Sequence, residues 1–174
     1  LIDNTPTIQI YHKSKLVLGV ERLPFAAILA PLESFAINLG GTFGSLGIAE
    51  KAEVFDTKTE TPIAPVICYE SIYGDYFGDY VANGANLVFI ITNDGWWEDT
   101  PGYKQHLSYA RLRAIESRRS IARSANTGIS CFINQRGDII TPTKWWEQDV
   151  ITGQINSNDK LTFYTINGDT IGRL

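Results

Sequence analysis

The stretch that decides the fold is "PVICYESIYGDYFGDYVANG", residues 65–84. It continues the apolar run "IAPVIC", which has the length of a buried strand and ends at Cys68. The following apolar and aromatic residues recur on one face of a helix: Ile72, Tyr73, Tyr76, Phe77, Tyr80 and Val81. Asn83-Gly84 is a typical helix end. Cys68 is therefore predicted to lie between a buried strand and a helix.

The rest of the chain extends this pattern in both directions. "NLVFIIT" (86–92) predicts a second buried strand, and "YKQHLSYARLRAIESRRSIARSA" (103–125) predicts one long helix. The core stripe expected for that helix is Leu107, Ala110, Ala114, Ile121 and Ala125. "GISCFIN" and "IITPT", around the turn "QRGD", predict two further strands, and "TIQIYHKSKLVL" (7–18) predicts an early one. Residues 51–62 read as a hairpin connection. Alternating strands and helices are typical of an α/β fold.

Composition excludes several function classes. The chain has 174 residues, 44% of them hydrophobic and 20% charged, which is typical of one globular domain. A net charge of −4 argues against general nucleic-acid binding. Two cysteines and two histidines without metal-ligand spacing argue against a zinc site, so we expect no metal. No apolar run reaches the roughly 18 residues that a membrane-spanning helix needs.

The position of Cys68 allows two interpretations. A helix start lowers the pKa of a thiol, and ligands bind at the carboxyl ends of parallel strands, so Cys68 could be a nucleophile. Cysteine is also among the most buried residue types, so it could simply fill space. His12 and His106 are possible partners, although no motif supports a cysteine–histidine pair. Lys13 could supply a fixed cation beside the thiolate, or it could be a solvated surface group.

Several segments resemble the nitrilase superfamily. "YHKSKLVLGVERLPF" resembles a segment in which lysine and glutamate lie eight residues apart, as Lys13 and Glu21 do. "ICYES" resembles the nucleophile elbow of that superfamily. Its Cys-Tyr-Glu form, with "ITNDGWWEDTPGYKQHLSYARLRAIESRRSIARSANTGISCFINQRGDI", is similar to the apolipoprotein N-acyltransferase branch.

The resemblance implies a fold and a location. It implies an α/β fold, a nitrilase-like α-β-β-α sandwich that is incomplete at the N-terminal side. Residues 1–174 would be the C-terminal portion of the catalytic domain, with the parent's membrane helices and upstream strands absent. The family's general-base glutamate would lie upstream of residue 1, so this fragment is expected to be inactive alone. The parent would sit in the bacterial inner membrane with its catalytic domain on the periplasmic face.

The resemblance also implies a mechanism and partners. Cys68 would take an acyl chain from a phospholipid as a thioester and pass it to the N-terminal cysteine amine of a diacylated lipoprotein, without a cofactor. Lys13 and the backbone N–H of Tyr69 would stabilise the oxyanion, and Glu21 would orient either Lys13 or the upstream general base. Six residues would line the pocket: Tyr69, Glu70, Asn93, Asp94, Trp96 and Trp97. Glu70 could equally be a helix-start carboxylate, and Asn93 part of a turn.

Two rival functions remain open: a soluble nitrilase-type amidase and a non-catalytic binding module. The nucleophile hypothesis predicts that the Lys13 amine lies within about 4 Å of the Cys68 sulfur, with Glu21 in the same cluster. It also predicts that Cys68 and Cys131 are both free thiols. The apolar stretch Leu23–Leu39 could contact a membrane or pack in the core. Five arginines could contact lipid head groups or form a solvated helix face: Arg111, Arg113, Arg118, Arg119 and Arg123.

Overall fold

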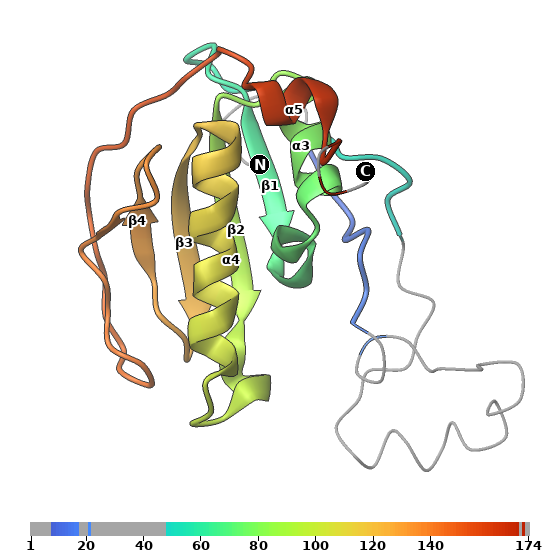
Figure 1. Ribbon diagram of the computed structural model, residues 1–174. Helices are drawn as coiled ribbons and strands as arrows, with labels where there is room; N and C mark the ends of the chain where they lie inside the picture. Colours follow the sequence, from blue (N-terminus) through green and yellow to red (C-terminus); the bar gives the residue numbers. More distant parts are fainter. Residues whose placement is uncertain (1–7, 18–20, 22–47, 171, 173–174) are drawn as a thin grey trace, which may run out of the picture.

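The computed structural model describes residues 8–17, 21, 48–170 and 172. Within them a five-stranded sheet has the order β1-β2-β3-β4-β5. Strands β1 (Ile63–Ile67), β2 (Leu87–Asn93) and β3 (Ser120–Asn126) pair in parallel. Strands β4 (Cys131–Ile133) and β5 (Ile139–Ile140) continue the sheet in antiparallel fashion. The three parallel strands therefore bring their carboxyl ends to one edge, at the lower end of the sheet in Figure 1.

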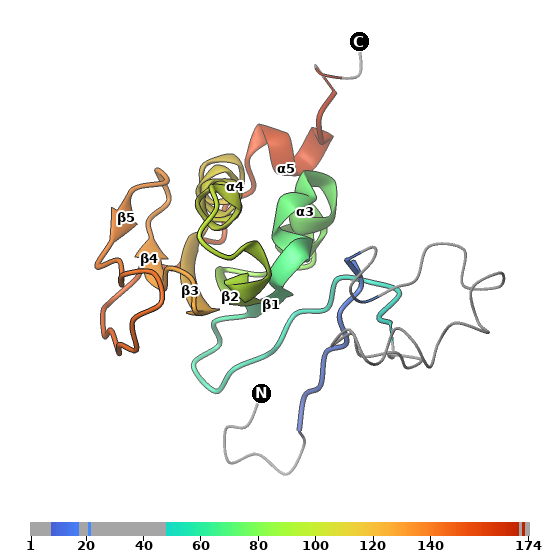
Figure 2. The ribbon, with the colours of Figure 1, turned by 90° about the horizontal axis from the view of Figure 1, so that it is seen from below.

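Helices cover one face of this sheet. Helices α3 (Gly74–Ala82) and α4 (Gly102–Ser117) lie side by side on it, and the short α5 (Phe163–Asn167) lies beside α3 (Figures 1 and 2). Strand β2 shows the consequence, because Val88 and Ile90 are buried while Phe89 and Ile91, on the opposite face, are exposed. The core lies between helices and sheet and consists mainly of Ala64, Val66, Phe77, Tyr80, Val81, Val88, Ile90, Leu107, Ala110, Ala114, Ile121 and Ile133.

Two single-turn 3-10 helices follow the parallel strands directly. η2 (Cys68–Ile72) follows β1, and η3 (Asp94–Trp97) follows β2. Before β1, the connection over residues 51–62 pairs Phe55 with Ile63 through two reciprocal backbone hydrogen bonds of 2.8 and 2.9 Å. The predicted α/β fold is confirmed, as are the strands around residues 63–68 and 86–92.

The early strand predicted over residues 7–18 is wrong for the residues that the structure describes. Residues 8–17 form no strand, and a bend lies at Ser14 and Lys15. Polar atoms of this segment bind side chains and loops instead of a neighbouring strand, since Gln9 exchanges two hydrogen bonds with the backbone of Asp56. The stretch Leu23–Leu39 lies outside the described residues.

The long helix predicted over residues 103–125 is also wrong in its second half. It ends at Ser117, Arg118 adopts a left-handed conformation with φ of 53°, and the chain continues as β3. Leu107, Ala110 and Ala114 are buried as expected of the helix, whereas Ile121 is buried from a strand.

Three of the five arginines differ from both of their expected roles, while Arg111 and Arg118 are exposed. Arg113, Arg119 and Arg123 are at most 5% exposed, so they neither meet lipid nor form a solvated face. Arg119 donates hydrogen bonds to the backbone carbonyls of Ala85, Ser117 and Lys160. In the described part of the chain, no helix combines the length and apolar character that crossing a membrane requires.

Candidate active site

Cys68 occupies a strained elbow at the carboxyl end of β1. It is partly exposed, and its φ of 49° lies in the left-handed region, which costs a non-glycine residue about 1–3 kcal/mol. The Ser71 hydroxyl donates to the Cys68 carbonyl at 2.8 Å and so closes the turn. A left-handed residue keeps this conformation only where neighbouring contacts hold it, and hydrogen bonds of Glu70 and of His106 lie on the two sides of Cys68.

Glu70 holds the elbow from one side. Its side chain is fully buried and accepts the backbone N–H of Ile67 at 2.7 Å and that of Ser14 at 2.6 Å. It also accepts the hydroxyl of Tyr11 at 2.6 Å and that of Tyr80 at 3.1 Å. One carboxylate therefore ties the segment around Ser14 to the end of β1.

The tyrosines around Glu70 form a hydrogen-bonded cluster. Tyr80 donates to Tyr11 at 2.6 Å, and the Tyr11 and Tyr76 hydroxyls lie 2.8 Å apart. Burial raises the pKa of Tyr11, and the hydrogen bond to Glu70 raises it further. Burial and the charge of Glu70 likewise raise the pKa of Tyr80. Both hydroxyls therefore stay protonated and remain donors to the carboxylate.

Lys13 and Glu21 form a bidentate ion pair. The Lys13 amine lies 2.7 and 2.6 Å from the two Glu21 carboxylate oxygens, and its side chain is only 11% exposed. Glu21 also accepts the backbone N–H of Val17 at 2.8 Å. Ser14, the residue after Lys13, donates its backbone N–H to Glu70. Glu70 lies two residues after Cys68, so this bond fastens the segment that carries the ion pair to the elbow.

A buried network holds the elbow from the other side. His106 of α4 places Nε2 3.2 Å from the Cys68 carbonyl oxygen and Nδ1 3.0 Å from Asp94 Oδ1. Arg123 of β3 donates to Asp94 Oδ2 at 2.7 Å. Burial alone would raise the pKa of Asp94, but the hydrogen bond from His106 and the charge of Arg123 together lower it. Asp94 is thus an ionised carboxylate between two nitrogen donors.

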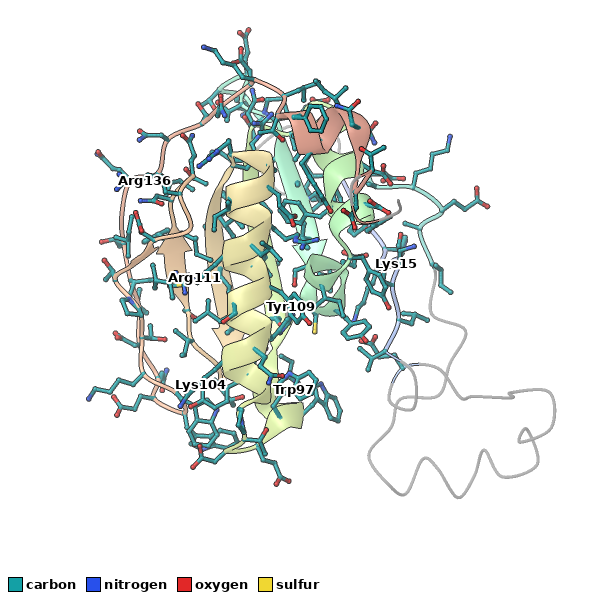
Figure 3. The ribbon with its side chains drawn as sticks, viewed as in Figure 1. Lys15, Trp97, Lys104, Tyr109, Arg111 and Arg136 are labelled. Atoms are coloured by element: carbon teal, nitrogen blue, oxygen red, sulfur yellow. The ribbon has the colours of Figure 1, made fainter. Side chains whose placement is uncertain are left out.

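A small cavity opens beside the elbow. It has a volume of about 220 Å³ and is lined by Tyr69, Ile72, Trp97, Gly102, Gln105, His106 and Tyr109. In Figure 3, Trp97 and Tyr109 lie on the side of α4 that faces the elbow. An aromatic cavity lined by Tyr69, the residue after Cys68, suits a substrate with an apolar group near its reacting carbonyl.

The carbon-nitrogen hydrolase family matches residues 1–160 of the sequence. The chain belongs to this family. An apolipoprotein N-acyltransferase of Chlorobaculum tepidum is 36% identical over 168 residues, which are 94% of this chain and 31% of the relative. An apolipoprotein N-acyltransferase of Rhizobium meliloti is 39% identical over 130 residues, 74% of this chain and 24% of the relative. The chain thus spans between about a quarter and a third of the length of these relatives.

Solved structures support the fold of this chain. The carbon-nitrogen hydrolase of Helicobacter pylori G27 has a TM-score of 0.53 and 12% identity, over 59% of this chain and 43% of its own. Nit3 of Saccharomyces cerevisiae, a member of branch 10 of the nitrilase superfamily, has a TM-score of 0.50 and 20% identity, over 60% of this chain and 41% of its own. The expected nitrilase-like fold class is therefore confirmed.

The structure brings some predicted site residues together and separates others. Tyr69 lines the cavity, but Glu70 has no exposed surface and lies behind the elbow as an anchor. Asn93 caps η3, where its side chain accepts the Gly95 N–H at 3.1 Å. Trp96 is 58% exposed, and its neighbour Trp97 lines the cavity beside the elbow. The catalytic roles of Cys68, Lys13 and Glu21 stay predictions.

Sequence reasoning missed the network of Asp94, His106 and Arg123. The sequence does contain a signal, since "ND" after a strand and "QH" at a helix start both occur in the blocks that resemble the acyltransferase branch. The two cysteines are free, and burial raises the pKa of the Cys131 thiol to about 11. Among the described residues, no three potential metal ligands gather into a site.

Proposed function

We propose that the protein containing this chain is an N-acyltransferase. It would move an acyl chain from a phospholipid to the N-terminal cysteine amine of a diacylated lipoprotein. The observation that carries this proposal is the 36% identity, over 94% of the chain, to a relative named apolipoprotein N-acyltransferase. The elbow at Cys68, tied to the segment of Lys13, supplies chemistry that suits such a reaction.

The first half of the reaction forms a thioester. The Cys68 sulfur attacks the ester carbonyl of the phospholipid, and the carbonyl electron pair moves to oxygen. Lys13, already desolvated and aligned by Glu21, would stabilise that oxyanion together with the backbone N–H of Tyr69. Collapse of the tetrahedral intermediate expels the lysophospholipid alkoxide, which takes a proton.

The second half transfers the acyl group to the amine. The lipoprotein amine attacks the thioester carbonyl through the same oxyanion site, and the Cys68 thiolate leaves. We assign the proton transfers to a glutamate that precedes Lys13 in the complete protein. The enzyme would act at the bacterial inner membrane, with this domain on the periplasmic face, where both lipidated substrates are accessible.

The test uses the protein encoded by the complete gene, reconstituted in phospholipid vesicles with a synthetic diacylated lipopeptide. Mass spectrometry should detect a lipopeptide heavier by one acyl chain, and Cys68→Ser should lower the rate at least about 10³-fold, as loss of the nucleophile does. If the wild type instead releases ammonia from short amides and leaves the lipopeptide unchanged, it is an amidase. If the wild type catalyses neither reaction, the domain is a binding module, and a rate that stays unchanged in Cys68→Ser would show that Cys68 is not the nucleophile.

A further inference from the structure

The peptide bond between Cys68 and Tyr69 links the nucleophile to the oxyanion donor. A trans peptide is planar, so its C=O and N–H point in opposite directions. The described chain contains no cis peptide bond, so the Cys68 carbonyl and the Tyr69 N–H follow this rule. Whatever holds the Cys68 carbonyl oxygen on the buried side therefore also aims the Tyr69 N–H toward the opposite side.

Two buried side chains contact that carbonyl oxygen. The Ser71 hydroxyl lies 2.8 Å from it and His106 Nε2 lies 3.2 Å from it, while Nε2 and the Ser71 hydroxyl are 3.1 Å apart. Ser71 and His106 are at most 4% exposed, so water does not compete for these contacts. The carbonyl oxygen can only accept, and the one Ser71 proton already points at it, so Nε2 holds the carbonyl only by donating a proton of its own.

Asp94 fixes the imidazole ring from behind. Its Oδ1 accepts Nδ1 of His106 at 3.0 Å and the hydroxyl of Thr92 at 3.1 Å, and its Oδ2 accepts Arg123 at 2.7 Å. An ionised carboxylate only accepts hydrogen bonds, so the proton of this contact resides on Nδ1. The ring angle is thereby set, and Nε2 is directed at the elbow. Because both partners of the ring accept, the contact with the Cys68 carbonyl needs a proton on each ring nitrogen, and the charge of the imidazolium is balanced by Asp94.

We infer that His106, braced by Asp94, is a positioning residue that fixes the Cys68–Tyr69 peptide so that the Tyr69 N–H faces the oxyanion. The need for this bracing follows from the strain at Cys68, because a left-handed residue returns to an extended conformation when its neighbouring peptide rotates. Rotation would turn the carbonyl toward the substrate and remove the N–H donor. The inference rests on the proposed function only for the role of Cys68 as an acyl-accepting nucleophile.

The experiment measures the two uses of Cys68 separately in the protein encoded by the complete gene. The burst of p-nitrophenolate from p-nitrophenyl octanoate reports formation of the acyl thioester, which needs the oxyanion donors. Alkylation of Cys68 by iodoacetamide, followed by peptide mass spectrometry, needs the thiolate but forms no oxyanion. The variants are His106→Leu, His106→Gln, Asp94→Asn and Ser71→Ala. Ser108→Ala is the control for Ser71→Ala, because Ser108 is exposed and its hydroxyl donates to the Lys104 carbonyl of its own helix.

His106→Leu should slow the burst by about 10²–10³-fold, the cost of one lost oxyanion donor, and leave the alkylation rate within about threefold. His106→Gln, whose amide can reach the carbonyl, should recover at least about tenfold of the loss. Asp94→Asn and Ser71→Ala should slow the burst by smaller factors, and Ser108→Ala should not change it.

Three results would overturn the inference: an unchanged burst in His106→Leu, a parallel fall of burst and alkylation, or no rescue by glutamine. If His106→Leu does not fold, Asp94→Asn and His106→Gln decide, and unchanged bursts in both would reject it. A wild-type burst without N-acylation of the lipopeptide would reject only the proposed function. A wild type without any burst would reject both.

Discussion

Replacing Glu70 by glutamine tests whether this carboxylate joins the Lys13 segment to the nucleophile elbow. One carboxylate oxygen accepts the Ser14 N–H and the Tyr11 hydroxyl, and the other accepts the Ile67 N–H and the Tyr80 hydroxyl. Glutamine keeps one acceptor oxygen and presents an NH₂ group in place of the other. In either orientation, the NH₂ group faces a backbone N–H that cannot turn away.

The magnitude follows from what the structure can rearrange. The tyrosine hydroxyls can redirect their protons to each other, since Tyr80 and Tyr11 lie 2.6 Å apart and Tyr11 and Tyr76 2.8 Å apart. The backbone donor instead loses a bond to a charged group, about 1.5–3 kcal/mol, and is left buried without a partner, about 1–3 kcal/mol. We expect Glu70→Gln to lower the free energy of unfolding by about 3–5 kcal/mol, a large share of the stability of a typical domain.

Pulse proteolysis across a urea series measures this free energy, and hydrogen exchange at the Ser14 amide reports the local detachment. Glu147→Gln is the matched control, because Glu147 is exposed and 3.4 Å from Lys144, a contact that contributes no more than about 0.5 kcal/mol. A free energy of unfolding within about 1 kcal/mol of the wild type, with unchanged exchange at Ser14, would refute the anchoring role of Glu70.

Three further outcomes are expected. At pH 8 iodoacetamide should modify Cys68 far faster than Cys131, because burial raises the pKa of Cys131 to about 11 and leaves about one thiol in 10³ ionised; peptide mass spectrometry measures both rates. The pKa of Asp94 is lowered in the folded state, so its stabilising effect is present above the unfolded value near 4 and is lost as pH falls through the folded value. The stability difference between wild type and Asp94→Asn in pulse proteolysis should therefore shrink below pH 4. Gly102→Ala should raise the KM for the acyl donor, because the added Cβ would lie 2.5 Å from the Trp97 ring and push it into the cavity; an unchanged KM would contradict this.

The part of the fold around Cys68 is readable from sequence because each element there carries one clear period. The apolar run before Cys68 has the length of a buried strand, and the aromatic spacing after it has the period of a helix. These signals place the cysteine at the carboxyl end of β1 without knowledge of any contact. The catalytic roles of Lys13 and Glu21, by contrast, came from resemblance, since a lone lysine has no local pattern that distinguishes it from a surface group.

The buried network escapes sequence reasoning for a physical reason. Asp94 and His106 are separated by 12 residues, and His106 and Arg123 by 17, so no local period joins them. They meet because α4 runs back along the sheet and β3 then pairs with β2 in a register that sets Arg123 opposite Ile90. Strand β3 itself, "SIARSAN", is rich in alanine and serine and contains an arginine, so its composition does not separate it from the preceding helix.

The boundary between α4 and β3 gives a last prediction. Arg118 ends the helix in a left-handed conformation with φ of 53°, a position that usually carries glycine, and this absence of glycine is why the sequence suggests an uninterrupted helix. Arg118→Gly should remove the backbone strain but also lose the bond from Arg118 to the Gln135 carbonyl, 3.1 Å long and exposed. Arg118→Ala loses the same bond and keeps the strain. The two variants should therefore differ by about 1 kcal/mol in the free energy of unfolding, with glycine the more stable, because only the backbone term separates them. Pulse proteolysis of both variants measures this difference. Equal stabilities would mean that the chain leaves the helix at Arg118 without strain, and that the pairing of β3 with β2 alone ends α4.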